Sequence, residues 1–134
     1  MQIKKTTFKK LKCLKKNAQK DHVVIDDFNN CTWFGAKIGN DFYVGCAGLV
    51  IKGKNLRFKG DFVSPNFRNQ GIYRKLFEYR MNYTEKLNFN KITAFCTPMS
   101  LSVYLANGFE RVSQKRLRDG TNIWYVISRM RNYD

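Results

Sequence analysis

Hydrophobic and polar positions alternate along the chain with two different periods, and the changes of period predict the order of the elements. Residues 8–20, "FKKLKCLKKNAQK", repeat at about 100° per residue, which is typical of an amphipathic helix. The apolar arc consists of Phe8, Leu11, Leu14 and Ala18. The opposite arc consists of Lys9, Lys10, Lys12, Lys16 and Lys20. We expect the apolar arc to pack on the protein, and the lysine arc either to be solvated or to bind an anion.

Three strand patterns follow this helix. The segments 31–38, "CTWFGAKI", and 42–51, "FYVGCAGLVI", flank the turn "GND", which predicts a hairpin. The segment 56–63, "LRFKGDFV", follows after the turn "KGKN". The three segments together predict an antiparallel meander.

The second half of the chain mixes helices with strands. In chain order the pattern predicts a helix over 71–88, a strand over 91–96, a short helix over 100–108, and a hairpin of strands 109–117 and 122–128. Gly108 stands where a helix commonly ends. Because helices alternate with strands, we expect a sheet that contains both parallel and antiparallel pairs.

Length and composition predict one domain over residues 1–134, and 43% hydrophobic with 15% aromatic residues is enough for a real core. No run approaches the roughly 18 apolar residues of a membrane span. The basic N-terminal segment lacks the apolar stretch of a signal peptide. We therefore expect a cytoplasmic protein, either a monomer or a homodimer, with no membrane span.

The cysteines are widely spaced and do not form a C-x-x-C pair; they are Cys13, Cys31, Cys46 and Cys96. His22 is the only histidine of the sequence. Metal sites need clustered ligands, so no metal site is predicted. We expect reduced cysteines that are buried as small hydrophobic residues.

The chain carries 25 basic and 10 acidic side chains, a net charge of +15. Such an imbalance favours an anionic partner, which could be nucleic acid, a nucleotide cofactor, an acidic protein or anionic lipid. A basic surface that serves only solubility is the alternative.

The stretch "SPNFRNQGIY", residues 64–73, connects the third strand to the long helix. A helix start has free backbone N–H groups and a partial positive charge. Gly71 lets a ligand approach the backbone, and Arg68 adds a cation. The stretch therefore suits a phosphate or pyrophosphate, although a plain connection with a surface arginine has the same appearance.

Two motifs resemble those of the GNAT acetyltransferase superfamily. "VSPNFRNQGI" resembles its acyl-CoA pyrophosphate loop, Arg/Gln-x-x-Gly-x-Gly/Ala, through Arg68 and Gly71. "SVYLANGFERV" resembles its L-Y-x-x-x-G-F segment through Tyr104, Gly108 and Phe109. The resemblance implies an α/β (α+β) GNAT fold, with a mixed central sheet of about six to seven strands, three to four helices and an abbreviated N-terminal region.

The sequence departs from the family pattern in two places. Tyr73 stands where the loop usually has Gly or Ala, so the ring must lie beside the phosphates or turn away. Thr97 stands where an asparagine often follows the fifth strand, which changes one contact to the cofactor or the acceptor.

The resemblance implies acetyl transfer from acetyl-CoA to a primary amine by direct attack. It assigns the cofactor contacts to Phe62, Val63, Ser64, Arg68, Asn69, Gln70, Gly71, Ile72, Tyr73 and Arg74. The first three would pair with the pantetheine arm, and the loop amides would hold the pyrophosphate. Tyr104 would protonate the departing thiolate, because a phenol keeps its proton at neutral pH.

The general base is less clear from the sequence. Asp61 lies in the strand before the loop, where members of the GNAT family usually have an apolar residue. It could be a base with a raised pKa. It could equally pair with Lys59 or Arg57. Asp26 and Asp27, or water, are the other candidates.

Three hypotheses for the role stay open. The acceptor could be a nucleic-acid-linked or nucleotide amine, which the charge favours, or a protein lysine or small amine. An inactive GNAT-fold binding module is the third, against which the presence of Arg68, Gly71 and Tyr104 argues. For a nucleic acid or acidic protein we expect contacts from the helix lysines and from Arg111, Lys115, Arg116 and Arg118.

Overall fold

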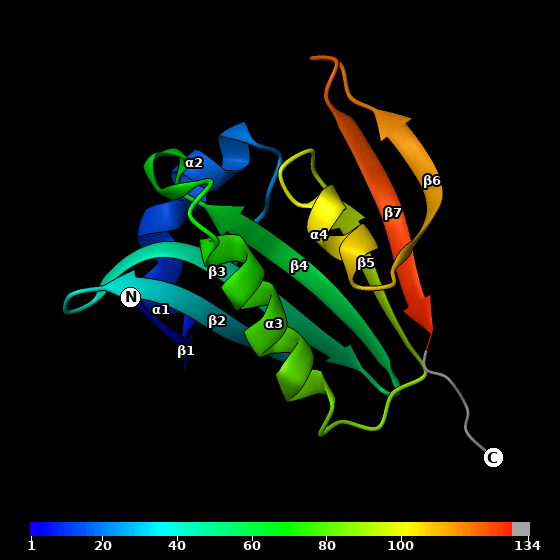
Figure 1. The fold of residues 1–134 in the computed structure, drawn as a ribbon, viewed down its shortest axis with the longest axis horizontal. Coiled ribbons are helices and arrows are strands. Elements are labelled where there is room, and N and C mark those ends of the chain that lie inside the picture. The colour runs from blue at the N-terminus through cyan, green and yellow to red at the C-terminus, as the bar shows by residue number, and fades with distance from the viewer. Residues whose placement is uncertain (130–134) are drawn as a thin grey trace.

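The computed structural model describes residues 1–129, which form a seven-stranded sheet with helices on both faces (Figure 1). The elements in chain order are β1 (Gln2–Thr6), α1 (Phe8–Leu11), a 3₁₀ turn (Lys12–Leu14), α2 (Lys15–Lys20), β2 (Cys31–Ile38), β3 (Phe42–Lys52), β4 (Asn55–Val63), a 3₁₀ turn (Pro65–Phe67), α3 (Ile72–Thr84), β5 (Lys91–Cys96), α4 (Leu101–Ala106), β6 (Glu110–Arg116) and β7 (Asn122–Arg129). The strand order is β1-β2-β3-β4-β5-β7-β6. β4 and β5 pair in parallel and the other neighbours antiparallel, so the predicted mixed sheet is confirmed.

The N-terminal region differs from the prediction. β1 was not expected, and it pairs antiparallel with β2 at the edge of the sheet. The predicted helix 8–20 is divided into α1, a 3₁₀ turn and α2. Its apolar arc is nevertheless the buried one, since Leu11, Leu14 and Ala18 are all at most 4% exposed. The amphipathic pattern thus located the packing face correctly, although it did not show the change of helix type.

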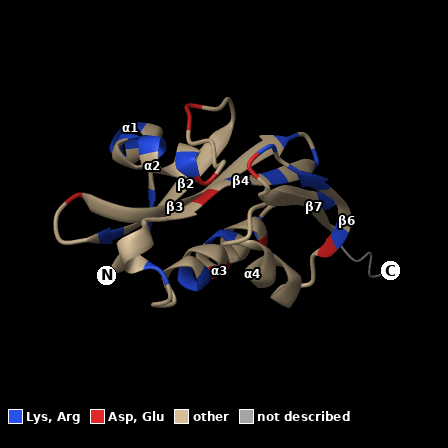
Figure 2. Cartoon of the chain, turned by 90° about the horizontal axis from the view of Figure 1, so that it is seen from above, with Lys and Arg blue, Asp and Glu red and all other residues tan. Residues whose placement is uncertain are grey.

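Two hydrophobic cores lie on opposite faces of the sheet. The first core lies under α3 and α4 and includes Phe58, Leu76 and Phe77. The second core lies under α1 and α2 and includes Trp33 and Phe62. Seen from above, α1 and α2 lie on one side of the strands, and α3 and α4 on the other (Figure 2). The sheet is therefore the wall between two sides of the molecule, and the position of a side chain on a strand decides which side it serves.

A β-bulge in the middle of β4 changes which side of the sheet the following side chains face. Gly48 pairs with Lys59, while Cys46 pairs with Phe62, so β4 has one extra residue at this point. Gly60 takes φ +72°, and a Cβ there would lie 2.3 Å from the Trp33 ring. Both constraints require glycine. Because of the bulge, Asp61 joins the α3 side of the sheet instead of continuing on the face of Lys59.

The bulge also marks where the central strands separate. The pairing of β4 with β5 ends at Phe58 and Ala94, before either strand ends. Figure 1 shows the two strands diverging beyond this point, with the start of α3 and α4 beside the opening. Gly108 ends α4 with φ +84°, and the Phe109 N–H bonds the Tyr104 carbonyl, as a Schellman cap requires. The predicted helix end at Gly108 is confirmed.

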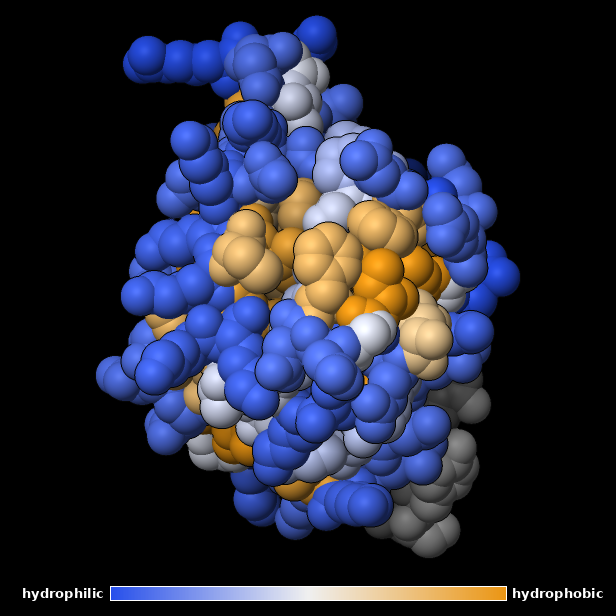
Figure 3. All heavy atoms as spheres, turned by 90° about the vertical axis from the view of Figure 1, so that its left-hand side faces the viewer, coloured by the Kyte–Doolittle hydropathy of each residue, from blue (hydrophilic) through white to orange (hydrophobic). Residues whose placement is uncertain are grey.

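The face of the molecule drawn in Figure 3 is mainly hydrophilic. This end of the molecule, at the left of Figure 1, has an apolar area in its centre. Phe42 is 57% exposed, and its ring packs edge-on against that of Phe67, with 6.3 Å between the two ring centroids. Within residues 1–129 no helix has both the length and the apolar character to cross a membrane.

Candidate active site

A cavity of about 600 Å³ lies between the end of β4, the start of α3 and the start of α4. This cofactor-side cavity is lined by Val63, Phe67, Arg68, Asn69, Gly71, Ile72, Tyr73, Arg74, Pro98, Met99, Ser102 and Val103. Its volume is typical of a small-molecule or cofactor site. Most of the residues predicted to contact the cofactor therefore line this one cavity.

The start of α3 is open toward this cavity. Asn69 and Gly71 both have positive φ, +63° and +79°. No atom lies within 4 Å of a Cβ built on Gly71, so the space above the backbone is free. The first turn of α3 contains no acidic residue, and Arg74 is exposed beside it. Free N–H groups, the helix dipole and a cation together have the chemistry that a pyrophosphate needs.

Arg68 is held within the protein. Its Nε donates to the Val63 carbonyl at 2.8 Å, and its Nη2 pairs with Asp21 Oδ2 at 2.5 Å. Asp21 directly follows α2, so the loop after α2 reaches across to the rim of the cavity. Arg68 is therefore fixed in place as expected, but part of its charge is compensated by Asp21, which the sequence did not reveal.

The three residues predicted to pair with the pantetheine arm have different positions. Val63 lines the cofactor-side cavity. Phe62 faces the second core and is fully buried. Ser64 uses both backbone groups internally, since its N–H bonds Val44 and its carbonyl accepts from Phe67. Val63 is thus the best placed of the three, with its carbonyl already accepting from Arg68, and Ser64 is a poor partner for a ligand.

Tyr73 turns away from the helix start. Its ring lines the cofactor-side cavity, but the side chain is only 8% exposed. Its hydroxyl donates to Asp61 Oδ2. The backbone of Tyr73 stays at the predicted pyrophosphate site, while its ring forms the inner wall of the cavity.

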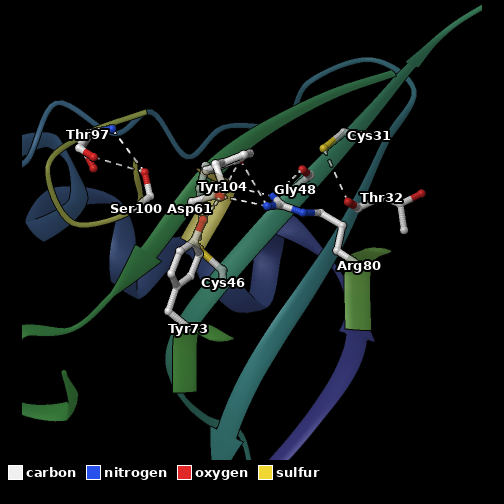
Figure 4. Close-up of polar contacts among 11 residues, drawn as sticks. Cys31, Thr32, Cys46, Gly48, Asp61, Tyr73, Arg80, Thr97, Ser100 and Tyr104 are labelled. Atoms are coloured by element: carbon white, nitrogen blue, oxygen red, sulfur yellow. Dashed lines mark hydrogen bonds and ion pairs between the residues drawn. The ribbon is translucent and has the colours of Figure 1, made fainter. Parts of the chain in front are cut away.

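Asp61 is the centre of a buried polar cluster formed with Tyr73, Arg80 and Tyr104 (Figure 4). Arg80 Nη1 donates to Oδ1 at 2.6 Å, and Nη2 donates to Oδ2 at 2.8 Å. Tyr104 donates to Oδ2 at 2.7 Å and accepts from Arg80 at 3.2 Å. The predicted partners Lys59 and Arg57 were wrong, because the bulge at Gly60 turns Asp61 to the opposite side of the sheet.

The cluster determines the proton affinity of its members. Burial raises the pKa of Asp61, but the Arg80 charge and the hydrogen bonds from Arg80 and both tyrosines outweigh burial and bring the pKa below its usual range. The expectation of a raised pKa was therefore wrong. Burial and the Asp61 charge raise the pKa of Tyr73 and Tyr104 well above that of a free phenol. Both hydroxyls thus keep their protons at neutral pH.

A second cavity, of about 330 Å³, opens on the α1–α2 side of the sheet. This acceptor-side cavity is lined by His22, Val23, Val24, Arg57, Phe58, Lys59, Gly60, Asp61, Phe95, Thr97 and Ser100. The Thr97 hydroxyl is buried and has no hydrogen-bond partner among the described residues, so it can serve a ligand. Asp26 and Asp27 do not line this cavity, and Asp26 pairs with Lys15 at 3.7 Å. Neither is placed to act as a base.

The two cavities meet below the loop after α2. A hollow of about 210 Å³ shares Arg68 with the cofactor-side cavity and His22 and Thr97 with the acceptor-side cavity. His22 Nε2 lies 2.6 Å from Asp119 Oδ2 in the β6–β7 turn. The loop therefore bridges the opening between β4 and the β6–β7 hairpin, and the groove beneath it is continuous.

The cysteines are free and differ in exposure. Cys46 and Cys96 are fully buried, as predicted, but the prediction of burial was wrong for Cys13, which is exposed, and Cys31 is only half-buried. Burial raises the pKa of Cys96 to about 12 and that of Cys31 to about 11. These thiols stay protonated and are unsuited to nucleophilic catalysis.

Two residues of the site, Arg80 and Gly60, were missed by the sequence analysis, although the sequence pattern indicated a special role for each. Arg80 lies four and eight positions after Leu76 and Ile72, on the buried face of α3. A charge on an apolar helix face predicts a buried partner. Gly60 interrupts a strand pattern, which is typical of a bulge. Asp21, by contrast, had no signal, because its partner is distant in the sequence.

Comparisons with known proteins agree with this geometry. The family model for the acetyltransferase (GNAT) domain matches residues 11–126. No curated protein sequence matches the chain significantly. Among solved structures, the ribosomal-protein-S18-alanine N-acetyltransferase from Escherichia coli has a TM-score of 0.79 at 15% identity, covering 99% of this chain and 96% of that one. An aminoglycoside 6'-N-acetyltransferase complexed with coenzyme A has a TM-score of 0.77 at 12% identity, covering 100% of both chains. At such identities these structures show a shared fold.

Proposed function

Since this chain belongs to the GNAT acetyltransferase family and is an N-acetyltransferase that uses acetyl-CoA, we propose which residues bind the cofactor, which side receives the amine and what kind of amine it is. The observation that carries the assignment is the open start of α3. There Gly71 has positive φ and free space, and the first turn of α3 contains no acidic residue.

The cofactor-side cavity is the proposed acetyl-CoA site. The amides from Asn69 to Arg74 hold the pyrophosphate, and Arg68 fixes the strand end that the pantetheine arm follows. Arg74 adds an exposed cation at the phosphates. Bound in this way, acetyl-CoA supplies an acetyl group as an activated thioester. The separation of β4 from β5 lets this group face the acceptor-side cavity.

The leaving sulfur needs a proton, and two phenols are available. Tyr104, the residue expected for this role, is 1% exposed and bonded to Asp61 and Arg80. Tyr73 donates to the same carboxylate oxygen and lines the cofactor-side cavity. We therefore propose that the phenol pair supplies the proton, with Tyr73 at the cavity wall and Tyr104 behind it. Asp61 orients both hydroxyls.

Asp61 is proposed as a positioning residue and not as the base. Its carboxylate already accepts from Arg80, Tyr73 and Tyr104, and its pKa is lowered. A carboxylate in that state is a weak base. The attacking ammonium loses its proton to water in the acceptor-side cavity.

The proposed acceptor is a nucleic-acid-linked or nucleotide amine. Arg57, Lys59 and His22 line the acceptor-side cavity, and its one carboxylate, Asp61, is neutralised by Arg80. A polycationic acceptor would meet like charge there, whereas an amine attached to phosphates would be attracted. A protein lysine or a small amine is the alternative, and it is favoured if the acceptor lacks phosphate.

The cofactor assignment is tested by thermal stability with acetyl-CoA. A ligand that binds only the folded state raises the melting temperature by mass action. Arg68→Ala should reduce the shift, and Gly71→Asp should nearly abolish it by placing a carboxylate at the phosphates. Gly53→Asp is the matched control, since Gly53 also has positive φ and no neighbour within 4 Å, but lies in the β3–β4 turn.

Equal shifts for Gly71→Asp and Gly53→Asp would overturn the pyrophosphate assignment. The acceptor is then sought by acetylation assays with nucleotide amines, aminoacyl-tRNA, protein lysines and small amines. Transfer only to acceptors without phosphate would refute the nucleic-acid-linked class.

A further inference from the structure

Within residues 1–129, one part of the sheet has no helix over it on the acceptor side. α1 and α2 cover this side only over β2, β3 and the end of β4, where the second core lies. Figure 2 shows open space over the same side of β6 and β7. All seven residues of β6 are exposed, and β7 is only partly buried along most of its length. This uncovered surface extends from β4 to β6.

The strand register identifies the side chains on this surface. Arg57 of β4 pairs with Thr93 of β5, and Phe95, two residues further, pairs with Tyr125 of β7. Paired residues and residues two apart in a strand share one face. The intervening residues of β5, such as Ala94, belong to the first core on the other face. Arg57, Phe95 and Tyr125 therefore lie on the uncovered side, and we call this surface the aromatic face.

The aromatic face combines flat rings with cations. Phe95 is 59% exposed in the interior of the sheet, and its ring centroid lies 5.0 Å from that of Tyr125. The Arg57 guanidinium lies 5.7 Å from the Phe95 centroid. Lys59, next on the same side of β4, lies 3.6 Å from the Phe28 centroid. Rings and cations thus alternate across the strands, whereas a merely solvated sheet face would carry polar side chains at these positions.

The aromatic face is continuous with the acceptor-side cavity. Arg57 and Phe95 line that cavity, and Arg57 and Tyr125 line a further hollow of about 180 Å³ with Lys52 and Lys91. A ligand on Phe95 and Tyr125 would therefore extend from the acceptor-side cavity across β5 and β7. Neighbouring strands lie about 4.8 Å apart, so the face has room for roughly two or three stacked bases.

Lys115 of β6 pairs with Ile123, two residues before Tyr125, so it lies on the same face. We infer that the aromatic face binds single-stranded nucleic acid, with bases stacked on Phe95 and Tyr125 and phosphates held by the surrounding cations, which are Arg57, Lys59, Lys115, Lys52 and Lys91. The inference rests on the proposed function, because it makes this nucleic acid the carrier of the acceptor amine. Stacking on aromatic side chains beside a basic groove is the general means by which proteins hold single strands. An acidic peptide would use the cations but would leave the rings exposed.

The test is fluorescence anisotropy with a labelled 12-nucleotide single-stranded RNA of mixed sequence at several salt concentrations. Phe95→Ala and Tyr125→Ala should each weaken binding about 5- to 150-fold, the loss of one stacked base. Tyr79→Ala is the matched control, since Tyr79 is an exposed aromatic residue of α3 on the other side of the sheet. Arg57→Gln should weaken binding, whereas Lys86→Gln should not, because Lys86 is exposed in the turn after α3, away from the aromatic face.

A duplex of the same sequence should compete at least tenfold more weakly, because its bases are already stacked. Equal binding by Phe95→Ala, Tyr125→Ala and Tyr79→Ala would overturn the inference. Displacement of the RNA by polyglutamate at equal charge would do the same and would favour an acidic protein. The acetyl-CoA thermal shift of the unaltered chain is measured separately: its absence refutes the cofactor assignment, whereas loss of RNA binding alone refutes only the aromatic face.

Discussion

Breaking the buried pair of Asp61 and Arg80 should cost much of the stability of the protein. Asp61 is 7% exposed and Arg80 is 0% exposed, and two hydrogen bonds join them. Arg80 also donates to the Gly48 carbonyl at 3.1 Å. Removing one partner leaves the other as an uncompensated buried charge, which typically costs about 3–5 kcal/mol. Because a whole domain is stable by only about 5–15 kcal/mol, Asp61→Asn or Arg80→Met should approach unfolding.

The double variant distinguishes an ion pair from two separate contributions. Asp61→Asn with Arg80→Met removes both charges, so the second substitution should cost less than it does alone. For residues in direct contact we expect a coupling of about 0.5–3 kcal/mol. Urea unfolding followed by tryptophan fluorescence measures each free energy. The surface pair of Lys15 and Asp26, 3.7 Å apart and partly exposed, is the control and should change stability by at most about 1 kcal/mol.

Two results would refute this reasoning. One is a cost below about 1 kcal/mol for Asp61→Asn, which would mean that Asp61 is not a buried ion in solution. The other is strict additivity in the double variant, which would mean that the two side chains do not interact.

The same pair predicts how stability depends on pH. The folded-state pKa of Asp61 lies below its ordinary value of 3.8. A lowered folded pKa contributes stability that is fully present above the unfolded pKa and is lost as pH falls toward the folded one. The contribution of Asp61 to the free energy of unfolding should therefore be constant between neutral pH and about 5, and it should decrease below about pH 4. Asp61→Asn should remove part of this acid dependence, and an unchanged acid limb in the variant would count against the assignment.

Three further predictions concern catalysis, thiol reactivity and charge. Tyr104→Phe and Tyr73→Phe should each lower kcat at least tenfold while acetyl-CoA affinity stays near that of the unaltered chain, because only a proton donor is lost; unchanged turnover in both would assign the proton to water. Cys13 should react with a thiol reagent at neutral pH long before Cys96, whose pKa is raised to about 12, and mass spectrometry of partly labelled protein would reveal the opposite order. Changing the five lysines of the lysine arc to glutamine should lower the log–log slope of RNA affinity against salt by up to about 3.5, and an unchanged slope would exclude those lysines from the contact. The five are Lys9, Lys10, Lys12, Lys16 and Lys20.

The order of the elements was predictable because it depends on local periodicity. The strands 31–38 and 91–96 alternate or are continuously apolar and have the predicted bounds. Helix ends were less predictable, and α3 stops at Thr84, four residues before the predicted end. β1 was missed because its sequence, QIKKT, is short and mostly polar, and only the pairing with β2 makes it a strand.

The site was predictable only where it is local in sequence. The loop from Arg68 to Arg74 is one continuous segment, and most of its residues line the same cavity. The surroundings of Asp61 were not predictable, because strand alternation places it beside Lys59 and Arg57. One extra residue at Gly60 reverses that alternation and brings Asp61 to Arg80 instead. A one-residue change of register thus converts a candidate base into part of a buried ion pair.

The same bulge explains how two ligands can meet in so small a domain. Beyond the pair of Phe58 and Ala94 the sheet is open, and a third hollow shares lining residues with both the cofactor-side cavity and the acceptor-side cavity. Asp61 stands at this opening: it lines the acceptor-side cavity, and its partner Tyr73 lines the other. The lysine arc of α1–α2 and the aromatic face lie on the acceptor side of the sheet. In the proposed function, a single strand that crosses from one to the other passes over the acceptor-side cavity, where an amine that it carries would face the acetyl group.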